Sequence, residues 1–294
     1  MDKIIRCITS DGAIMASAID ASDIVFTAKK LHHLSRSATA AMGRLLCATS
    51  IMGAMLKQKD ATINLRVMGD GPIGPIITVA DSKGNVRGYV GDSNCPTEYY
   101  NNGKINVAKA VGKNGVLNVM RDYGEGEPYI GQVELVSGEI AEDITNYFAT
   151  SEQIPTVCAL GVLINKEDGE VMLAGGLIIQ LLPGADDQTI EKLEKNVEKL
   201  EPVTTMLAKG MSILDICKTA LEGFEVEVLD EYPVNYACTC SKQKLERYFC
   251  TMSDDDVRSM ADDNGVATAT CNFCNKRYVF SKDDLERIIK EKNS

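Results

Sequence analysis

The chain has 294 residues, of which 45% are hydrophobic and 25% charged, as expected for a globular protein of about two domains. Its formal net charge of −11 argues against a general nucleic-acid binder, because such proteins usually present a basic face to phosphates. The first residues contain no apolar core typical of a signal peptide, so we expect a cytoplasmic protein.

The first region, residues 1–182, begins with strand signals at 4–9 and 13–19. A long helix is then expected from Ser35 or Ser37, both good helix caps, through Leu56. Its apolar part is shorter than the roughly 20 residues of a membrane-spanning helix, which predicts a buried helix instead. Gly43 and Gly53 within this helix indicate close packing against its neighbours.

Further strands are expected where apolar residues alternate with polar ones or flank turn sequences. They lie at 63–67, 76–80, 86–90, 116–120 and 133–136, with a hairpin of 157–164 and 171–182. A helix over 138–152 would place Ile140, Ile144, Tyr147 and Phe148 on one stripe. The pattern predicts an α+β protein whose N-terminal domain, 1–182, is mixed α/β.

The second region, residues 183–231, reads as an acidic helical linker. It contains 5 Lys and Arg against 12 Asp and Glu, a net charge of −7. Helices are expected after Asp186 or Asp187, after Pro202 and after Ser212. Because its apolar stripe is narrow and its charges repel, the segment should be only marginally stable alone and should need a partner surface.

The third region, residues 232–294, contains two paired-thiol motifs, Cys238-Thr239-Cys240 and Cys271-Asn272-Phe273-Cys274, separated by 30 residues. Two such pairs supply the four soft ligands that zinc takes at the corners of a tetrahedron. The sequence therefore predicts a small C-terminal zinc-binding domain with one Zn²⁺ held by Cys238, Cys240, Cys271 and Cys274.

A closed site of four cysteines is usually structural, because no position stays open for water or substrate. Zinc also keeps the sulfurs deprotonated, however, and oxidants attack thiolates. Each sequence pair could close on itself, and oxidation would then eject the metal on which so small a domain depends. These motifs are thus compatible with either a structural site or a redox sensor.

The other cysteines carry weaker signals. Five of them lie scattered among apolar neighbours or in turns and are expected to be small hydrophobic residues; they are Cys7, Cys47, Cys95, Cys158 and Cys217. Cys250 follows a helix expected over 242–249 and is interpreted as a buried thiol. The sequence does not decide whether Cys250 also takes part in disulfide formation. His32 and His33 are interpreted as helix-entry residues, far in sequence from the four cysteines.

The whole chain resembles the 33 kDa chaperonin family of redox-regulated bacterial heat-shock holdases. The resemblance is carried by both cysteine motifs and by stretches of the first region. These stretches are Gly43-Arg44-Leu45-Leu46, Gly69-Asp70-Gly71-Pro72-Ile73-Gly74, Val86-Arg87-Gly88-Tyr89-Val90, Ser137-Gly138-Glu139-Ile140-Ala141-Glu142-Asp143, Tyr147-Phe148, Ser151-Glu152-Gln153, Ala174-Gly175-Gly176 and Gln180-Leu181-Leu182-Pro183. Cys250 departs from the family pattern.

The resemblance implies a chaperone that uses no ATP and is not an enzyme. It would be inactive when reduced and zinc-bound. Under oxidative stress, disulfides Cys238–Cys240 and Cys271–Cys274 would form and zinc would leave. The linker would then unfold, and the protein would dimerise and bind unfolded client proteins. Neither nucleic acid nor membrane is an expected partner.

Two other function classes could account for single motifs of this sequence. A zinc-ribbon nucleic-acid binder is the first alternative, but residues 232–294 carry 10 basic and 10 acidic side chains, whereas affinity for phosphates rests on Lys and Arg. An enzyme is the second. Gly69, Gly71 and Gly74 have dinucleotide-fingerprint spacing but precede a strand-like stretch, not a helix. A thiol oxidoreductase would need a free Cys-x-x-Cys at a helix start.

Overall fold

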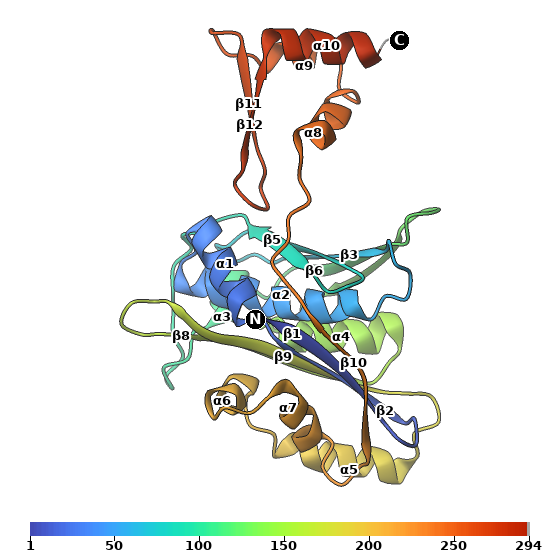
Figure 1. Ribbon diagram of the computed structural model, residues 1–294. Helices are drawn as coiled ribbons and strands as arrows, with labels where there is room; N and C mark the ends of the chain where they lie inside the picture. Colours follow the sequence, from blue (N-terminus) through green and yellow to red (C-terminus); the bar gives the residue numbers. More distant parts are fainter. Residues whose placement is uncertain (293–294) are drawn as a thin grey trace. The chain divides into compact units, whose positions relative to one another are not determined.

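The computed structural model describes residues 1–292, which divide into a first compact unit, Met1–Ala237, and a second unit that begins at Cys238. The first unit contains two five-stranded antiparallel sheets (Figure 1). From one edge to the other, the first sheet has β10 (Val226–Pro233), β1 (Lys3–Thr9), β2 (Ile14–Asp20), β9 (Val171–Leu181) and β8 (Thr156–Ile164). The second has β5 (Val86–Val90), β4 (Ile76–Asp81), β3 (Thr62–Met68), β6 (Val116–Asp122) and β7 (Tyr129–Glu134).

Helices lie between the two sheets and carry the larger core. The central one is α2 (Arg36–Ala54), which Ser35 caps and which packs against strands of both sheets (Figure 1). A Cβ added at Gly43 would come within 2.7 Å of Val162, and one at Gly53 within 2.6 Å of a backbone oxygen of Asp81. The predicted buried helix and the close packing at its two glycines are thus confirmed.

Two shorter helices of this layer differ from expectation. Helix α1 (Ser22–His32) was not predicted, and the interpretation of His32 and His33 as helix-entry residues was wrong, because His32 ends α1 and His33 is its C-terminal cap. The helix expected over 138–152 begins later, as α4 (Ala141–Tyr147), and continues as a π-helical turn, η1 (Phe148–Glu152). Its predicted stripe is fully or almost fully buried. Helix α3 (Val107–Val111) completes the helices of this part of the chain.

Three amphipathic helices cover the other face of the first sheet. They are α5 (Asp187–Glu198), α6 (Val203–Ala208) and α7 (Ile213–Ala220). Asp186 and Ser212 cap α5 and α7 as the sequence predicts, and Pro202 precedes α6. Their apolar side chains share a second core with β1, β2 and β9. Figure 1 shows the three helices together on one side of this sheet. This sheet face is a partner surface of the kind the acidic segment was expected to need.

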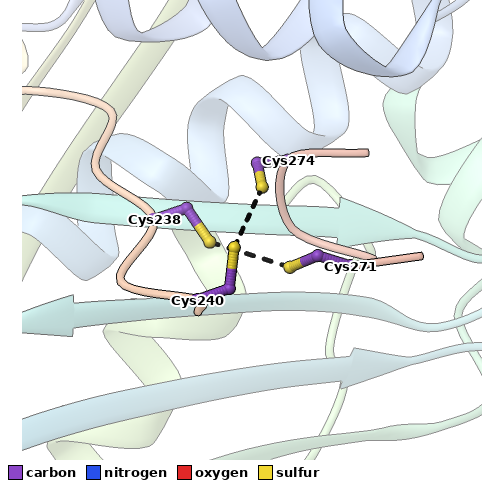
Figure 2. Close-up of side chains that lie close together, drawn as sticks. All are labelled: Cys238, Cys240, Cys271 and Cys274. Carbon is purple, nitrogen blue, oxygen red and sulfur yellow. Dashed lines mark hydrogen bonds between the residues drawn. The ribbon is translucent and has the colours of Figure 1, made fainter. Parts of the chain in front are cut away.

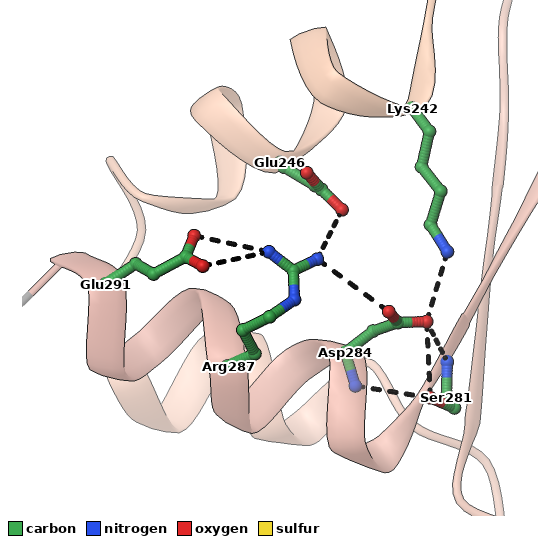
Figure 3. Close-up of polar contacts among 6 residues, drawn as sticks. All are labelled: Lys242, Glu246, Ser281, Asp284, Arg287 and Glu291. Carbon is green, nitrogen blue, oxygen red and sulfur yellow. Dashed lines mark hydrogen bonds and ion pairs between the residues drawn. The ribbon is translucent and has the colours of Figure 1, made fainter.

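The second unit is a small α+β arrangement. It contains α8 (Lys242–Phe249), α9 (Asp254–Ser259), the hairpin of β11 (Val266–Thr270) and β12 (Arg277–Ser281), and α10 (Lys282–Lys292). Eight buried side chains form its core, with the rings of Phe249 and Phe280 edge to face at 5.0 Å. Two ion pairs also join helix α8 to α10, Lys242 to Asp284 at 3.1 Å and Glu246 to Arg287 at 2.7 Å (Figure 3).

The fold is therefore α+β, as predicted. Among residues 1–292, no helix combines the length and apolar character that a membrane crossing requires. The three-part division at 182 and 231 stays a prediction.

Candidate metal centre

The four predicted ligands come from two short segments of the second unit. Cys238 and Cys240 lie in the extended stretch that enters α8, whose N-terminal cap is Ser241. Cys271 and Cys274 lie in the turn that joins β11 to β12. Figure 2 shows the four sulfur atoms converging from these two segments.

All four sulfur atoms lie within 4.8 Å of one another. The Sγ atoms of Cys238 and Cys271 are 3.7 Å apart, and those of Cys240 and Cys274 are 3.4 Å apart (Figure 2). Sulfurs at tetrahedral corners about 2.3 Å from a zinc ion would be separated by about 3.8 Å. The group therefore has the size of a tetrahedral tetrathiolate site, and this donor set fits zinc.

Local backbone geometry presents the thiols in pairs. In the second segment, the N–H groups of Cys274 and Asn275 point back to the carbonyl oxygen of Cys271, at 3.4 and 2.8 Å, and Asn275 takes a left-handed conformation with φ of 56°. The backbone N–H of Lys276 donates to Cys274 sulfur, and that of Cys240 donates to Cys238 sulfur. Such bonds stabilise sulfur in its anionic form.

The thiols differ in acidity because their surroundings differ. Burial raises the pKa of Cys238 and of Cys274. Burial also disfavours ionisation of Cys240, but hydrogen bonds from the Tyr278 hydroxyl and the neighbouring thiols lower its pKa to about 7. Cys240 is thus the thiol of this group best prepared to become a thiolate, the form that binds metal and reacts with oxidants.

Tyr278 is a functional candidate that the sequence analysis missed. Its hydroxyl lies 3.1 Å from the sulfur of Cys240, and this contact raises the pKa of Tyr278 to about 12. The residue follows the second cysteine pair on β12, so an aromatic hydroxyl just after a Cys-x-x-Cys turn is the signal that could have indicated it.

Other residues named from the sequence are not members of this group. Cys250 caps the C-terminus of α8, is partly buried against the small core, and is not among the clustered thiols. Cys7, Cys47, Cys95 and Cys217 are buried and Cys158 packs against the larger core, as expected of small apolar residues. His32 belongs to the first unit, where its Nε2 lies 3.1 Å from the hydroxyl of Tyr236.

The glycine fingerprint has a packing role. Gly69, Gly71 and Gly74 form the turn between β3 and β4, and no helix follows them. A Cβ at Gly71 would lie 2.3 Å from a backbone oxygen of Ala110. The glycines therefore allow close contact between two backbone segments, and this turn lacks the strand–helix geometry of a dinucleotide site.

Comparison with known proteins places the chain in a chaperone family. The chain belongs to the Hsp33 family, because the family model described as Hsp33 protein matches residues 2–281. Curated relatives bear the name 33 kDa chaperonin. The protein from Acetivibrio thermocellus is 45% identical over 98% of this chain and 97% of its own length, and that from Clostridioides difficile is 46% identical over 99% of each.

A solved structure agrees with this assignment. The crystal structure of the 33 kDa chaperonin (heat shock protein 33 homologue) from Thermotoga maritima superimposes with a TM-score of 0.90 at 32% identity, covering 99% of this chain and 98% of that one. The resemblance stated from sequence motifs is thus confirmed at the level of family and fold.

Proposed function

We propose that this chain is a redox-regulated, ATP-independent holdase, inactive while its four clustered cysteines are reduced and hold one Zn²⁺. The observation that carries the proposal is the convergence of Cys238, Cys240, Cys271 and Cys274 within a small unit whose core contains only eight buried side chains. Membership of a chaperone family supports the other part of the proposal, that the active protein protects unfolding proteins from aggregation.

Bound zinc would keep the four sulfurs ionised and join the segment before α8 to the β11–β12 turn. The residues themselves determine how the site responds to oxidant. One of the four thiolates attacks peroxide, which gives a sulfenic acid and water. A neighbouring thiol then displaces the hydroxyl as a second water, so two thiols lose two electrons and two protons for each peroxide consumed.

We propose Cys238–Cys240 and Cys271–Cys274 as the resulting disulfides, the pairing implied by the family. Disulfide sulfurs are no longer anionic donors, so the oxidised group cannot retain the metal. The second unit then loses the ion that joins its two cysteine segments.

The acidic segment 183–231 is proposed to respond next. Its helices are held to the first sheet through one shared apolar face, while many of its charged side chains face solvent. Opening this layer would expose apolar surfaces of both the helices and the sheet, the chemistry that recognises unfolded chains. We further propose dimerisation of the oxidised form and a cytoplasmic location, with a role in the stress response and with no enzymatic activity.

The test pairs zinc release with chaperone activity. Full-length zinc-loaded protein is treated with hydrogen peroxide at mild heat. One zinc per chain should be released, and aggregation of a thermally unfolding client should then be suppressed. Equal suppression by the reduced zinc form would refute the switch, and peptide mapping that finds pairs other than 238–240 and 271–274 would refute the pairing.

A matched control uses the thiol outside the cluster. Cys250→Ser should release zinc and form the same two disulfides as the unmodified chain, whereas Cys271→Ser should bind zinc weakly from the start. Salt-dependent binding of the reduced protein to DNA or RNA would instead support the zinc-ribbon alternative.

A further inference from the structure

A second pair of thiols lies inside the first unit, whereas the clustered cysteines belong to the second. Cys7 lies on β1 and Cys217 on α7, and both side chains are fully buried in the core between the first sheet and helices α5–α7. Each thiol alters the ionisation of the other, because the neighbouring Cys217 lowers the pKa of Cys7 while Cys7 raises the pKa of Cys217. Residues 210 positions apart in sequence thus become neighbours in one core, across the interface between a strand and a helix.

The contact follows from the packing of both elements. Along β1, Ile5 and Cys7 point toward the helical layer while Ile4 points to the opposite core. On α7, Ile213, Ile216 and Cys217 form the buried face that packs on β1 and β2. Each thiol therefore stands on the face that its element presents to the other, and opening the layer would separate them.

The surroundings favour a dithiol over a metal site. The neighbouring buried side chains in this core are aliphatic, and in the part of the chain that the structure describes only the C-terminal cysteines form a group of three or more potential metal ligands. The neighbouring Cys7 and burial raise the pKa of Cys217, while Cys217 lowers the pKa of Cys7. Cys7 is thus the more acidic thiol of the pair.

We propose that Cys7 and Cys217 are a second redox site, whose disulfide fastens helix α7 to strand β1 and opposes opening of the α5–α7 layer. The oxidant is a peroxide. Cys7 sulfur displaces water from it to form a sulfenic acid, and Cys217 sulfur then forms the S–S bond as a second water leaves. Two thiols are oxidised by two electrons and one peroxide is reduced to two waters.

Burial determines when this reaction occurs. Neither thiol is exposed while the layer is packed, so an oxidant reaches them only when α7 moves away from the sheet. If the pair reacts on re-closure, a transient opening is converted into a covalently closed state. The site therefore acts in the opposite direction to the zinc cluster: oxidation of the cluster is proposed to promote opening, and oxidation of this pair restrains it. This consequence for activity rests on the proposed function, whereas the disulfide itself does not.

The experiment maps disulfides in the full-length protein after treatment with peroxide or diamide at a temperature where amides of α7 exchange with solvent. Tryptic digestion without reduction should yield residues 7–29 linked to residues 210–218. Hydrogen exchange of α7 should slow by on the order of tenfold or more. Both thiols remaining free, or Cys7 linked to any cysteine other than Cys217, would overturn the proposal without need of a variant.

Variants separate the two proposals. Cys217→Ala should abolish the linked peptide and the slowing of exchange, and Cys47→Ser, a buried thiol of the other core, should leave both intact. Under sustained oxidation, Cys217→Ala should suppress client aggregation more strongly than the unmodified chain. A linked, slowly exchanging protein that never suppresses aggregation would refute the holdase alone, and suppression without any Cys7–Cys217 link would refute the second redox site alone.

Discussion

Residues 1–237 bury apolar side chains on both faces of one five-stranded sheet, whereas the unit from Cys238 onward buries eight side chains beside four thiols. The first unit has enough apolar area to be stabilised by burial. The second is below the size at which a single core usually suffices, and such domains commonly depend on a metal. The two units thus differ in what stabilises them, which is apolar burial in the first and, as proposed, bonds between thiolates and a metal in the second.

The largest effect should come from removing the metal from the reduced protein. Apparent binding free energies of structural zinc sites are about 10–16 kcal/mol, more than so small a core supplies. Chelation should make residues 238–292 susceptible to protease, together with the α5–α7 layer that is proposed to open next, while a fragment near 1–181 stays resistant, as mass spectrometry of the products would show. Restored resistance on adding zinc is the control, and a second unit that resists protease without metal would break the comparison.

The next largest effect should come from removing buried apolar atoms from the first unit. Ile216 on α7 is fully buried against the first sheet, so Ile216→Ala should cost about 2–5 kcal/mol in the stability of the helical layer. Hydrogen exchange of α5–α7 should accelerate. Zinc affinity should also fall, because a layer that opens when zinc leaves must, by reciprocal linkage, weaken zinc binding when the layer itself is destabilised. The exposed Lys218→Ala on the same helix should leave both exchange and zinc affinity nearly as they were. An unchanged zinc affinity in Ile216→Ala would show that zinc binding and the helical layer are not coupled.

A smaller effect is expected at the hydroxyl beside the cluster. Tyr278→Phe removes the hydrogen bond to Cys240 and should weaken zinc binding about tenfold, the lower end of the range for groups that support metal ligands. Competition with a chelator of known affinity measures this change. Tyr248→Phe, which alters a hydroxyl on an exposed ring of α8, is the matched control. Equal affinity in both variants would remove Tyr278 from the site.

Acid should have opposite effects on the two units, because it favours the folded state of the first unit through Asp2 and weakens metal binding by the second. Asp2 is almost fully buried and accepts backbone N–H bonds from Asp23 and Ile24 at the start of α1. Burial raises its pKa to about 6, above about 3.9 in an unfolded chain, so the folded state binds more protons between these values. Its contribution to stability is present below about pH 4 and is lost as pH rises through about 6.

Asp2→Asn should therefore flatten the pH dependence of the free energy of unfolding of the first unit between about pH 4 and 6, by on the order of 1 kcal/mol. The exposed Asp23→Asn should not. Metal binding by the second unit should change in the opposite direction, weakening in acid as the thiols take up protons. An unchanged slope in Asp2→Asn, measured by denaturant titration, would contradict the assignment to Asp2.

The smallest effect is expected at the ion pairs of the second unit. Arg287 contacts Glu246 at 2.7 Å and Glu291 at 3.1 Å, but its side chain is 44% exposed (Figure 3). Exposed pairs contribute about 0–1 kcal/mol, so Arg287→Ala should change thermal stability of the zinc-bound unit only slightly. The exposed Arg247→Ala gives the reference. A destabilisation as large as that of metal removal would show that charges, and not thiolates, stabilise this unit.

Local sequence signals predicted the elements whose causes are local. Ser35, Asp186 and Ser212 cap the helices they were expected to cap, and the turn after Asn165 joins the predicted hairpin of β8 and β9. The four clustered cysteines could likewise be grouped from spacing, because each pair presents two sulfurs from a short segment.

Elements with distant causes were missed. The N-cap residue of helix α1, Ala21, has no capping side chain. Asp20 accepts the N–H of Ser22, but the carboxylate that binds the next two N–H groups, of Asp23 and Ile24, belongs to Asp2, some twenty residues earlier. Strand β10 is mostly exposed and is fixed by pairing with β1, more than two hundred positions away. The contact of Cys7 with Cys217 depends on that same long-range packing, so single-sequence reasoning saw two unrelated buried thiols.

The pairing of β10 with β1 has a consequence for the segment between β9 and β10. Both flanking strands belong to one sheet, so residues 182–225 form a loop whose two ends are anchored in the same rigid body. If its helices melted, the chain would remain a closed loop and could not drift away from the surface it had left. The entropic cost of closing a loop grows slowly with its length, by about 0.6 kcal/mol per doubling. Because the two strands already hold the ends together, the helices need not bear this cost again when they fold back onto the sheet. Refolding of the layer is then a search within a tethered loop, in which the unfolded helices stay close to the sheet face that they covered.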